Sequence, residues 1–162
     1  MALWGHSFGG FAALVAATQT ERFKGIIASA ATSDMVSQWA GVDPARRFRP
    51  SDGVGGFGSM RWSESGQGTM GAPPWSDTDR YLRNSPLFAA DKVNTPVLLI
   101  HGDQDENPVG QSEEMFYALW RQNKDAQLLI YWGEHHTPSS PGNLRDLYGR
   151  VFKWLRMTMP PN

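Results

Sequence analysis

The chain has 162 residues, of which 40% are hydrophobic and 12% aromatic; this is enough for one domain with a substantial core and excludes a disordered protein. Its 15 basic and 16 acidic residues give a net charge of −1, so no overall field favours nucleic acid or an anionic membrane as a partner. Because there is no cysteine, a disulfide framework, a thiol nucleophile and a thiolate metal site are all excluded.

The longest apolar stretch, at residues 8–17, contains glycines and is too short to cross a bilayer. No basic residue precedes it and no small-residue cleavage site follows, so it reads as part of the fold and not as a signal peptide. We expect a soluble chain without a membrane partner. The compartment stays open, with the cytoplasm as the favoured expectation.

Four short apolar runs predict β-strands, at residues 2–4, 24–32, 95–103 and 126–132. The last two runs are continuously apolar, which is typical of parallel strands buried on both faces.

Three segments predict helices, at residues 8–19, 112–123 and 143–157. The first is rich in alanine, so it can lie close to a sheet. The last has one apolar face at helical spacing, made by Leu144, Leu147, Tyr148, Val151, Phe152 and Leu155.

Residues 34–92 are expected to form an irregular insertion within a single domain that spans residues 1–162, with short helices near 34–39 and 77–82. Elsewhere strands and helices alternate, which predicts an α/β fold with about four mostly parallel strands flanked by helices. Sites in such sheets lie beyond the carboxyl ends of the strands.

Three of the predicted strands end in polar motifs: "GHSFGG", "HGDQDENPVG" and "GEHHTP". A G-x-S-x-G pattern alone is weak, since a chain of this length shows one by chance roughly one time in twenty. Here it joins a strand to a helix, which would place Ser7 at the apex of a sharp turn. Gly5 and Gly9 are expected to let the strand and the helix approach closely.

A serine nucleophile needs a base, and the base needs an acid to orient it. Aspartate and histidine follow in the chain order Ser, Asp, His that this strand-turn-helix geometry uses. The alternative is that the three motifs are unrelated polar loops. His6 is expected to be a residue of the turn or a supporting neighbour of the site and not the base, because it precedes the serine and should point away from it. His101 is expected to be structural, because it ends a buried strand.

The motifs carry a resemblance that covers nearly the whole chain. "GHSFGG", residues 84–136 from "NSPLF" to "GEHH", and "RVFKWL" resemble the C-terminal part of the peptidase domain of the prolyl oligopeptidase family. That family includes acylaminoacyl peptidases, dipeptidyl peptidases and glutamyl endopeptidases. The resemblance implies the C-terminal half of an α/β-hydrolase fold and hydrolysis of peptide or acyl-peptide substrates through an acyl-enzyme, with no metal and no organic cofactor.

Carried over by motif position, Ser7 matches the nucleophile and the N–H of Phe8 matches an oxyanion donor. Asp105 matches the acid, three residues after the "HG" that ends the strand. Asp103 is its competitor, with a capping role in the loop as the simpler explanation.

His136, the last residue of "GEHH", matches the base. His135 stands where the family has a glycine, so the choice between the two imidazoles remains open. The segment "DENPVG" departs from the order of acid, any two residues and valine that many members show, and the related "DNNP" forms resemble the glutamyl endopeptidase branch.

In the family, further strands precede the nucleophile strand and supply a second oxyanion donor. The chain is therefore expected to be the last half of a catalytic domain, with an exposed edge strand that could template a homo-oligomer. Two alternatives to a serine peptidase remain: a carboxylesterase or other acyl hydrolase with the same triad, and an inactive fragment or interaction module.

Overall fold

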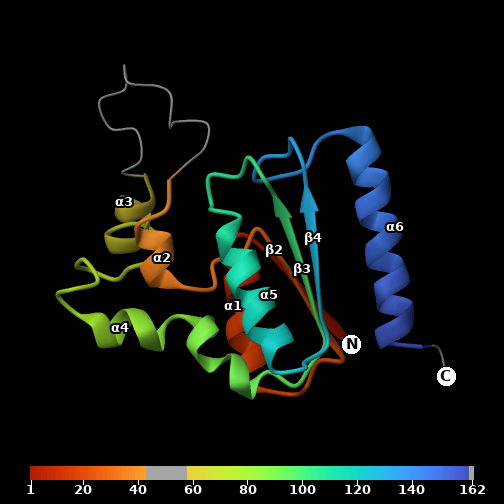
Figure 1. Ribbon diagram of the computed structural model, residues 1–162, viewed down its shortest axis with the longest axis horizontal. Coiled ribbons are helices and arrows are strands. Elements are labelled where there is room, and N and C mark those ends of the chain that lie inside the picture. The colour runs from red at the N-terminus through yellow and green to blue at the C-terminus, as the bar shows by residue number, and fades with distance from the viewer. Residues whose placement is uncertain (43–57, 161–162) are drawn as a thin grey trace.

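Four parallel strands form a single sheet in the order β1-β2-β3-β4 (Figure 1). They are β1 (Ala2–His6), β2 (Gly25–Ser29), β3 (Val97–Gly102) and β4 (Ala126–Tyr131). The computed structural model describes residues 1–42 and 58–160. The predicted class, an α/β fold of four parallel strands flanked by helices, is confirmed.

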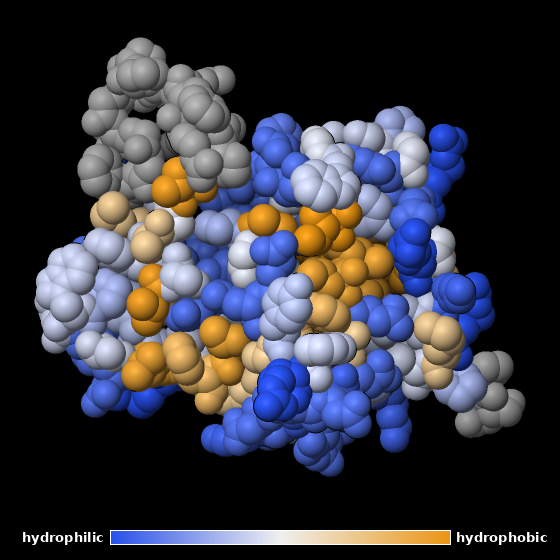
Figure 2. Space-filling view, in the orientation of Figure 1, coloured by the Kyte–Doolittle hydropathy of each residue, from blue (hydrophilic) through white to orange (hydrophobic). Residues whose placement is uncertain are grey.

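The two central strands differ from the two outer ones in burial. Every residue of β2 and β3 is buried, as their continuous apolar runs predict. In β4 only Tyr131 is buried, so the expectation of a fully buried strand is wrong there. The reason is its position, because β4 is an edge strand with a neighbour on one side only. Hydrophobic residues are visible on the surface in the region of β4 (Figure 2).

Helices cover both faces of the sheet (Figure 1). One face packs against α1 (Phe8–Gln19), α5 (Gly110–Arg121) and the 3₁₀ helix η2 (Pro86–Lys92). The other face packs against α6 (Pro141–Thr158). Alternate residues of each central strand serve opposite faces: Ile26 and Leu99 face α1 and α5, whereas Ile27 and Leu98 face α6.

The buried side of α6 differs from the predicted apolar face. Leu147, Val151 and Trp154 are buried, whereas Tyr148 and Phe152 are 48% and 55% exposed. The large Trp154 side chain fills the space against the sheet, and the buried stripe runs through 147, 151 and 154. Tyr148 instead packs edge-on against Trp4 of β1, and it stacks on Phe152.

Three short helices follow β2: α2 (Met35–Trp39), α3 (Gly58–Glu64) and α4 (Thr78–Arg83). Asp34 begins α2 by accepting a hydrogen bond from the Val36 N–H, and Asp77 begins α4 by accepting one from the Arg80 N–H. The helices expected near 34–39 and 77–82 are therefore present. They surround a small cluster of Met35, Met70 and Tyr81 beside the main sheet. Part of the predicted insertion, residues 43–57, lies outside the described residues.

No helix in the described ranges has the length and the hydropathy that crossing a membrane requires.

Candidate active site

Ser7 occupies the turn between β1 and α1. Its φ of 59° is positive, which is uncommon for a residue other than glycine and typical of a strained strand-to-helix turn that presents a nucleophile. The Ser7 N–H donates to the Ser29 carbonyl at 2.8 Å, and the Ser7 carbonyl accepts from the Phe11 N–H at 3.0 Å. These bonds hold the turn between the neighbouring strand and the first turn of α1.

Two glycines around Ser7 allow the close approach of strand and helix, but they are not the expected pair. A Cβ on Gly5 would clash with the Gly9 carbonyl, and a Cβ on Gly10 would lie 2.7 Å from the Ser29 carbonyl oxygen. A Cβ on Gly9 would meet nothing within 4 Å. The expectation for Gly5 is thus met, whereas that for Gly9 is wrong because its Cβ position points into open space.

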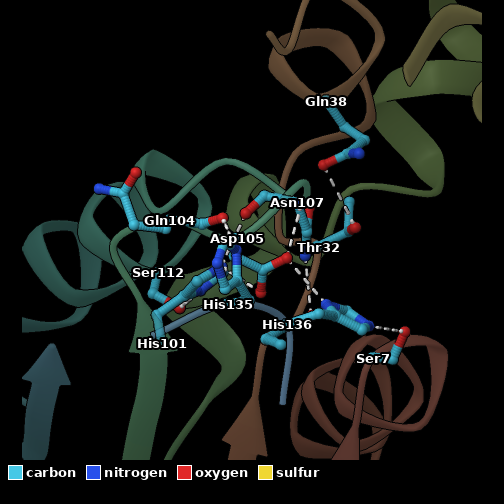
Figure 3. Close-up of polar contacts among 11 residues, drawn as sticks. Ser7, Thr32, Gln38, His101, Gln104, Asp105, Asn107, Ser112, His135 and His136 are labelled. Carbon is cyan, nitrogen blue, oxygen red and sulfur yellow. Dashed lines mark hydrogen bonds and ion pairs between the residues drawn. The ribbon is translucent and has the colours of Figure 1, made fainter. Parts of the chain in front are cut away.

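Ser7, His136 and Asp105 lie in a row at the carboxyl ends of the strands (Figure 3). His136 Nε2 lies 2.8 Å from Ser7 Oγ, and His136 Nδ1 lies 2.8 Å from Asp105 Oδ1. The Asp105 side chain is completely buried, whereas that of His136 is 28% exposed. A carboxylate can only accept, so Nδ1 carries the proton and Nε2 is left to accept from the Ser7 hydroxyl.

The surroundings shift the pKa of both titratable members of this row. The hydrogen bond to Asp105 raises the pKa of His136 against the opposing effect of burial. Burial pushes the pKa of Asp105 up, but the neighbouring His101 imidazole and the hydrogen bond from His136 outweigh it and the net pKa is lowered. Asp105 is therefore suited to remain an anion beside the imidazole.

The competing residues of both motifs are placed elsewhere. Asp103 accepts from the Gly133 N–H and from Gln104 Nε2, as a loop-capping acid would. His135 is exposed, and its Nδ1 lies 3.0 Å from the Gln104 carbonyl oxygen. Figure 3 shows His135 beside this loop, while the imidazole of His136 extends to Ser7. The structure brings Ser7, Asp105 and His136 together and leaves Asp103 and His135 outside the row.

The family model described as "Prolyl oligopeptidase family" matches residues 1–160. The chain belongs to the prolyl oligopeptidase family. An uncharacterized peptidase of Bacillus subtilis, YuxL, is 30% identical over 148 residues, which are 91% of this chain and 20% of that protein. A probable chloroplastic glutamyl endopeptidase of Arabidopsis thaliana is 32% identical over 91 residues, 54% of this chain and 10% of that protein.

Solved structures of peptidases share the fold. A puromycin-hydrolyzing peptidase of Mycobacterium tuberculosis has a TM-score of 0.80 and 27% identity, over 99% of this chain and 22% of that one. An acylaminoacyl peptidase of Pyrococcus horikoshii has a TM-score of 0.75 and 24% identity, over 96% of this chain and 23% of that one. The matched part of this chain thus spans between 10% and 23% of the length of these relatives, and the α/β-hydrolase peptidase fold is shown over that part.

His6 lies beside the site as a supporting neighbour, one of the roles expected for it from the sequence. Its ring packs against that of His136, with the ring centroids 4.8 Å apart, a contact that the sequence did not predict. Burial and the neighbouring His136 lower the pKa of His6. A neutral His6 suits this position, because a second positive charge there would oppose protonation of His136.

Glu134 organises the loop that carries His136. Its carboxylate accepts from the N–H groups of Ser139 and Ser140 and from Asn143 Nδ2, at 2.7, 3.1 and 2.7 Å. Hydrogen bonds from Ser140, Ser139 and Asn143 lower the pKa of Glu134 to about 2. Its carbonyl accepts from the Gln104 N–H at 3.0 Å, which ties the histidine loop to the loop of Asp105. Glu134 could not be selected from the sequence, because its partners lie in the segment 139–143 and not at a recognisable capping position.

Ser7 and His136 open onto a cavity of about 290 Å³. Its lining is mixed and includes Thr32, Gln38, Trp62, Glu106 and Asn107. Within the described ranges, no group of three histidine, aspartate or glutamate side chains could hold a metal ion.

Proposed function

We propose that this chain carries the nucleophile, base and acid of a serine peptidase that hydrolyses peptide or acyl-amide bonds. The observation that supports it most directly is the continuous row of hydrogen bonds from Ser7 through His136 to Asp105, with 2.8 Å at each step. Membership of the prolyl oligopeptidase family and the similarity to proteins named as peptidases support the same function.

The first half of the proposed reaction forms an acyl-enzyme. His136 Nε2 takes the Ser7 proton while Oγ attacks the substrate carbonyl carbon, and the resulting imidazolium is stabilised by the Asp105 carboxylate. His136 then gives this proton to the leaving amine as the C–N bond breaks. Asp105 stays ionised throughout, since its role is to hold the tautomer and balance the positive charge.

The second half repeats these steps with water. His136 takes a proton from the water that attacks the acyl carbonyl, and it returns the proton to Ser7 Oγ as the ester bond breaks. In both halves negative charge develops on the carbonyl oxygen. Phe8 begins α1, so its N–H has no carbonyl acceptor within the helix and is our proposed oxyanion donor.

The test is covalent labelling by a fluorophosphonate combined with turnover of matched peptide anilides and acyl esters. We expect labelling of the unmodified chain at Ser7, none in Ser7→Ala, and full labelling in the matched control Ser37→Ala, whose hydroxyl lies away from His136. Anilide turnover supports a peptidase. Turnover of esters alone would identify an acyl hydrolase, and an unlabelled but folded chain would contradict the proposed nucleophile.

A further inference from the structure

A second imidazole, His101, lies against Asp105 on the side opposite His136. We propose that His101 is a positioning residue that fixes the Asp105 carboxylate for its partner His136, an inference that rests on the proposed function. The sequence marks His101 only as the polar end of a buried strand.

His101 is held by three elements at once (Figure 3). It stands near the end of β3, and its side chain is completely buried. Its Nδ1 lies 2.7 Å from Ser112 Oγ on α5, and its Nε2 lies 2.9 Å from the Asn107 carbonyl oxygen. The same Nε2 is 3.3 Å from Asp105 Oδ2. A ring held in this way has little freedom to rotate.

The chemistry of its neighbours determines where the His101 proton lies. A backbone carbonyl and a carboxylate both accept, so Nε2 must carry hydrogen, and the Ser112 hydroxyl can donate to Nδ1. The Nε2–H is aligned with the Asn107 carbonyl. Asp105 Oδ2 accepts no well-aligned hydrogen bond from the described residues, so its attraction to the positive edge of His101 is electrostatic.

The two oxygens of Asp105 therefore have different surroundings. Oδ1 accepts from His136 Nδ1 and from the Asn107 N–H, each at 2.8 Å. Oδ2 faces His101. The Asn107 backbone contacts both residues, since its N–H donates to Asp105 and its carbonyl accepts from His101. This arrangement fixes the plane of the carboxylate, which sets the direction of the oxygen that His136 uses.

A buried carboxylate without compensation is unfavourable, and His101 supplies much of that compensation. Among the groups that lower the pKa of Asp105, the contact with His101 is the largest, ahead of that with His136. Two further titratable groups act on the row from outside. His6 of β1 packs on His136 and opposes its protonation, and the charge of Glu106 favours it.

The experiment compares His101→Leu, His101→Gln and Ser112→Ala for kcat, KM and the pH profile of kcat/KM on one peptide anilide. In His101→Leu we expect kcat to fall about ten- to a hundredfold with KM nearly unchanged, because an orienting contact to a charge is lost. In His101→Gln a side-chain N–H can again face Asp105, so we expect most of kcat to return. Ser112→Ala removes the contact at Nδ1 but leaves those at Nε2, so we expect a smaller fall in kcat than in His101→Leu.

The pH profile distinguishes positioning from packing. Without the positive edge of His101, the Asp105–His136 pair holds its shared proton more tightly, whichever residue is assigned that proton. The acid limb of the kcat/KM profile should therefore move to higher pH in His101→Leu. In His101→Gln it should return towards its position in the unmodified chain. A fall in kcat with an unmoved acid limb, or no recovery with glutamine, would overturn the proposal.

A measurement on the unmodified chain covers the case in which His101→Leu does not fold. In ¹⁵N-histidine NMR spectra, we expect a proton bonded to His101 Nε2, with a resonance that moves when a fluorophosphonate captures Ser7. An Nε2 without hydrogen would contradict the proposal. Absence of labelling at Ser7 would instead contradict the proposed peptidase function, and the proton on Nε2 can still be read in that case.

Discussion

Asp103 and Asp105 share one loop and one residue chemistry, yet their surroundings assign them different tasks. The carboxylate of Asp105 is sealed from water between two imidazoles, whereas that of Asp103 caps the loop after β4 through the Gly133 N–H. Spacing after "HG" favoured Asp105, but the distances to His136 provide the physical reason. The same comparison separates His136 from its neighbour His135.

The first prediction concerns pH and the acid. His136 must be neutral to accept a proton, and its pKa lies above the ordinary value of 6.5, so turnover should rise with pH through a midpoint above 6.5. Asp105→Asn removes the cause of that shift and favours the wrong tautomer. We expect kcat to fall about 10⁴-fold, as is typical of serine proteases, and any residual acid limb to move to lower pH.

Asp103→Asn is the matched control for this prediction. It keeps an acceptor for the Gly133 N–H, so kcat and the acid limb should stay near those of the unmodified chain. Steady-state kinetics from pH 5 to pH 9 measure both variants. Equal losses in the two variants would contradict the assignment of Asp105 as the acid.

At the scale of elements, the turn from β1 to α1 positions Ser7, the proposed nucleophile, by steric fit. Gly5 touches the start of α1 and Gly10 touches β2, so the helix lies directly on the ends of two strands. Gly9, although it completes the G-x-S-x-G pattern, has open space at its Cβ position. Within this turn the pattern therefore combines one glycine required for close contact with one that is not.

The second prediction tests this difference. Gly5→Ala forces the strand and helix apart, which should cost about 1–3 kcal/mol and lower the Tm by several degrees. It should also reduce fluorophosphonate labelling of Ser7, because the turn is displaced. Gly9→Ala adds a good helix former without a clash, so stability should stay equal or increase by up to about 1 kcal/mol. Calorimetry and labelling rates measure both; a harmless Gly5→Ala would contradict the steric argument.

The elements were largely predictable from the sequence, since apolar runs and helical periodicity depend on local spacing. It was harder to predict which apolar residues become buried. Trp154 takes the place of Phe152 on the inner side of α6, because the surface of the sheet determines which side chains fit there. Ser7, Asp105 and His136 could be selected because each follows a strand and stands at a motif position of the family that the sequence resembles. His6 and His101 could not, because their contacts join residues far apart in the chain.

For the molecule as a whole, Glu134 connects parts that the strands alone do not join. Its carboxylate holds the segment that leads into α6, the helix that covers one face of the sheet, and its carbonyl holds the loop of Asp105 through Gln104. Packing of Leu147, Val151 and Trp154 completes the attachment of α6. The histidine loop thus takes its position from both the helix layer and the sheet.

The third prediction concerns acid stability. The pKa of Glu134 is lowered from 4.5 to about 2 on folding, so its ionised form contributes stability that is fully present above pH 4.5. This contribution is lost as the pH falls from about 4.5 towards 2. Glu134→Gln should lower the Tm at neutral pH by roughly 3–8 °C and remove this part of the pH dependence.

The stabilities of the two proteins should therefore converge near pH 2. Thermal denaturation between pH 2 and pH 7 measures this, with Glu113→Gln on α5 as a control expected to follow the unmodified chain. Curves that stay parallel over the whole range would show that Glu134 acts without its charge.

At Ser7 the backbone conformation places the stability of the turn and the reactivity of the side chain in opposition. A positive φ suits glycine better than serine, so Ser7→Gly would relax the turn while it removes the proposed nucleophile. Screens that reward heat resistance alone would therefore tend to select an inert protein at this position. A selection scheme that aims at a robust catalyst has to score turnover in every round and should seek its stabilising changes away from this turn.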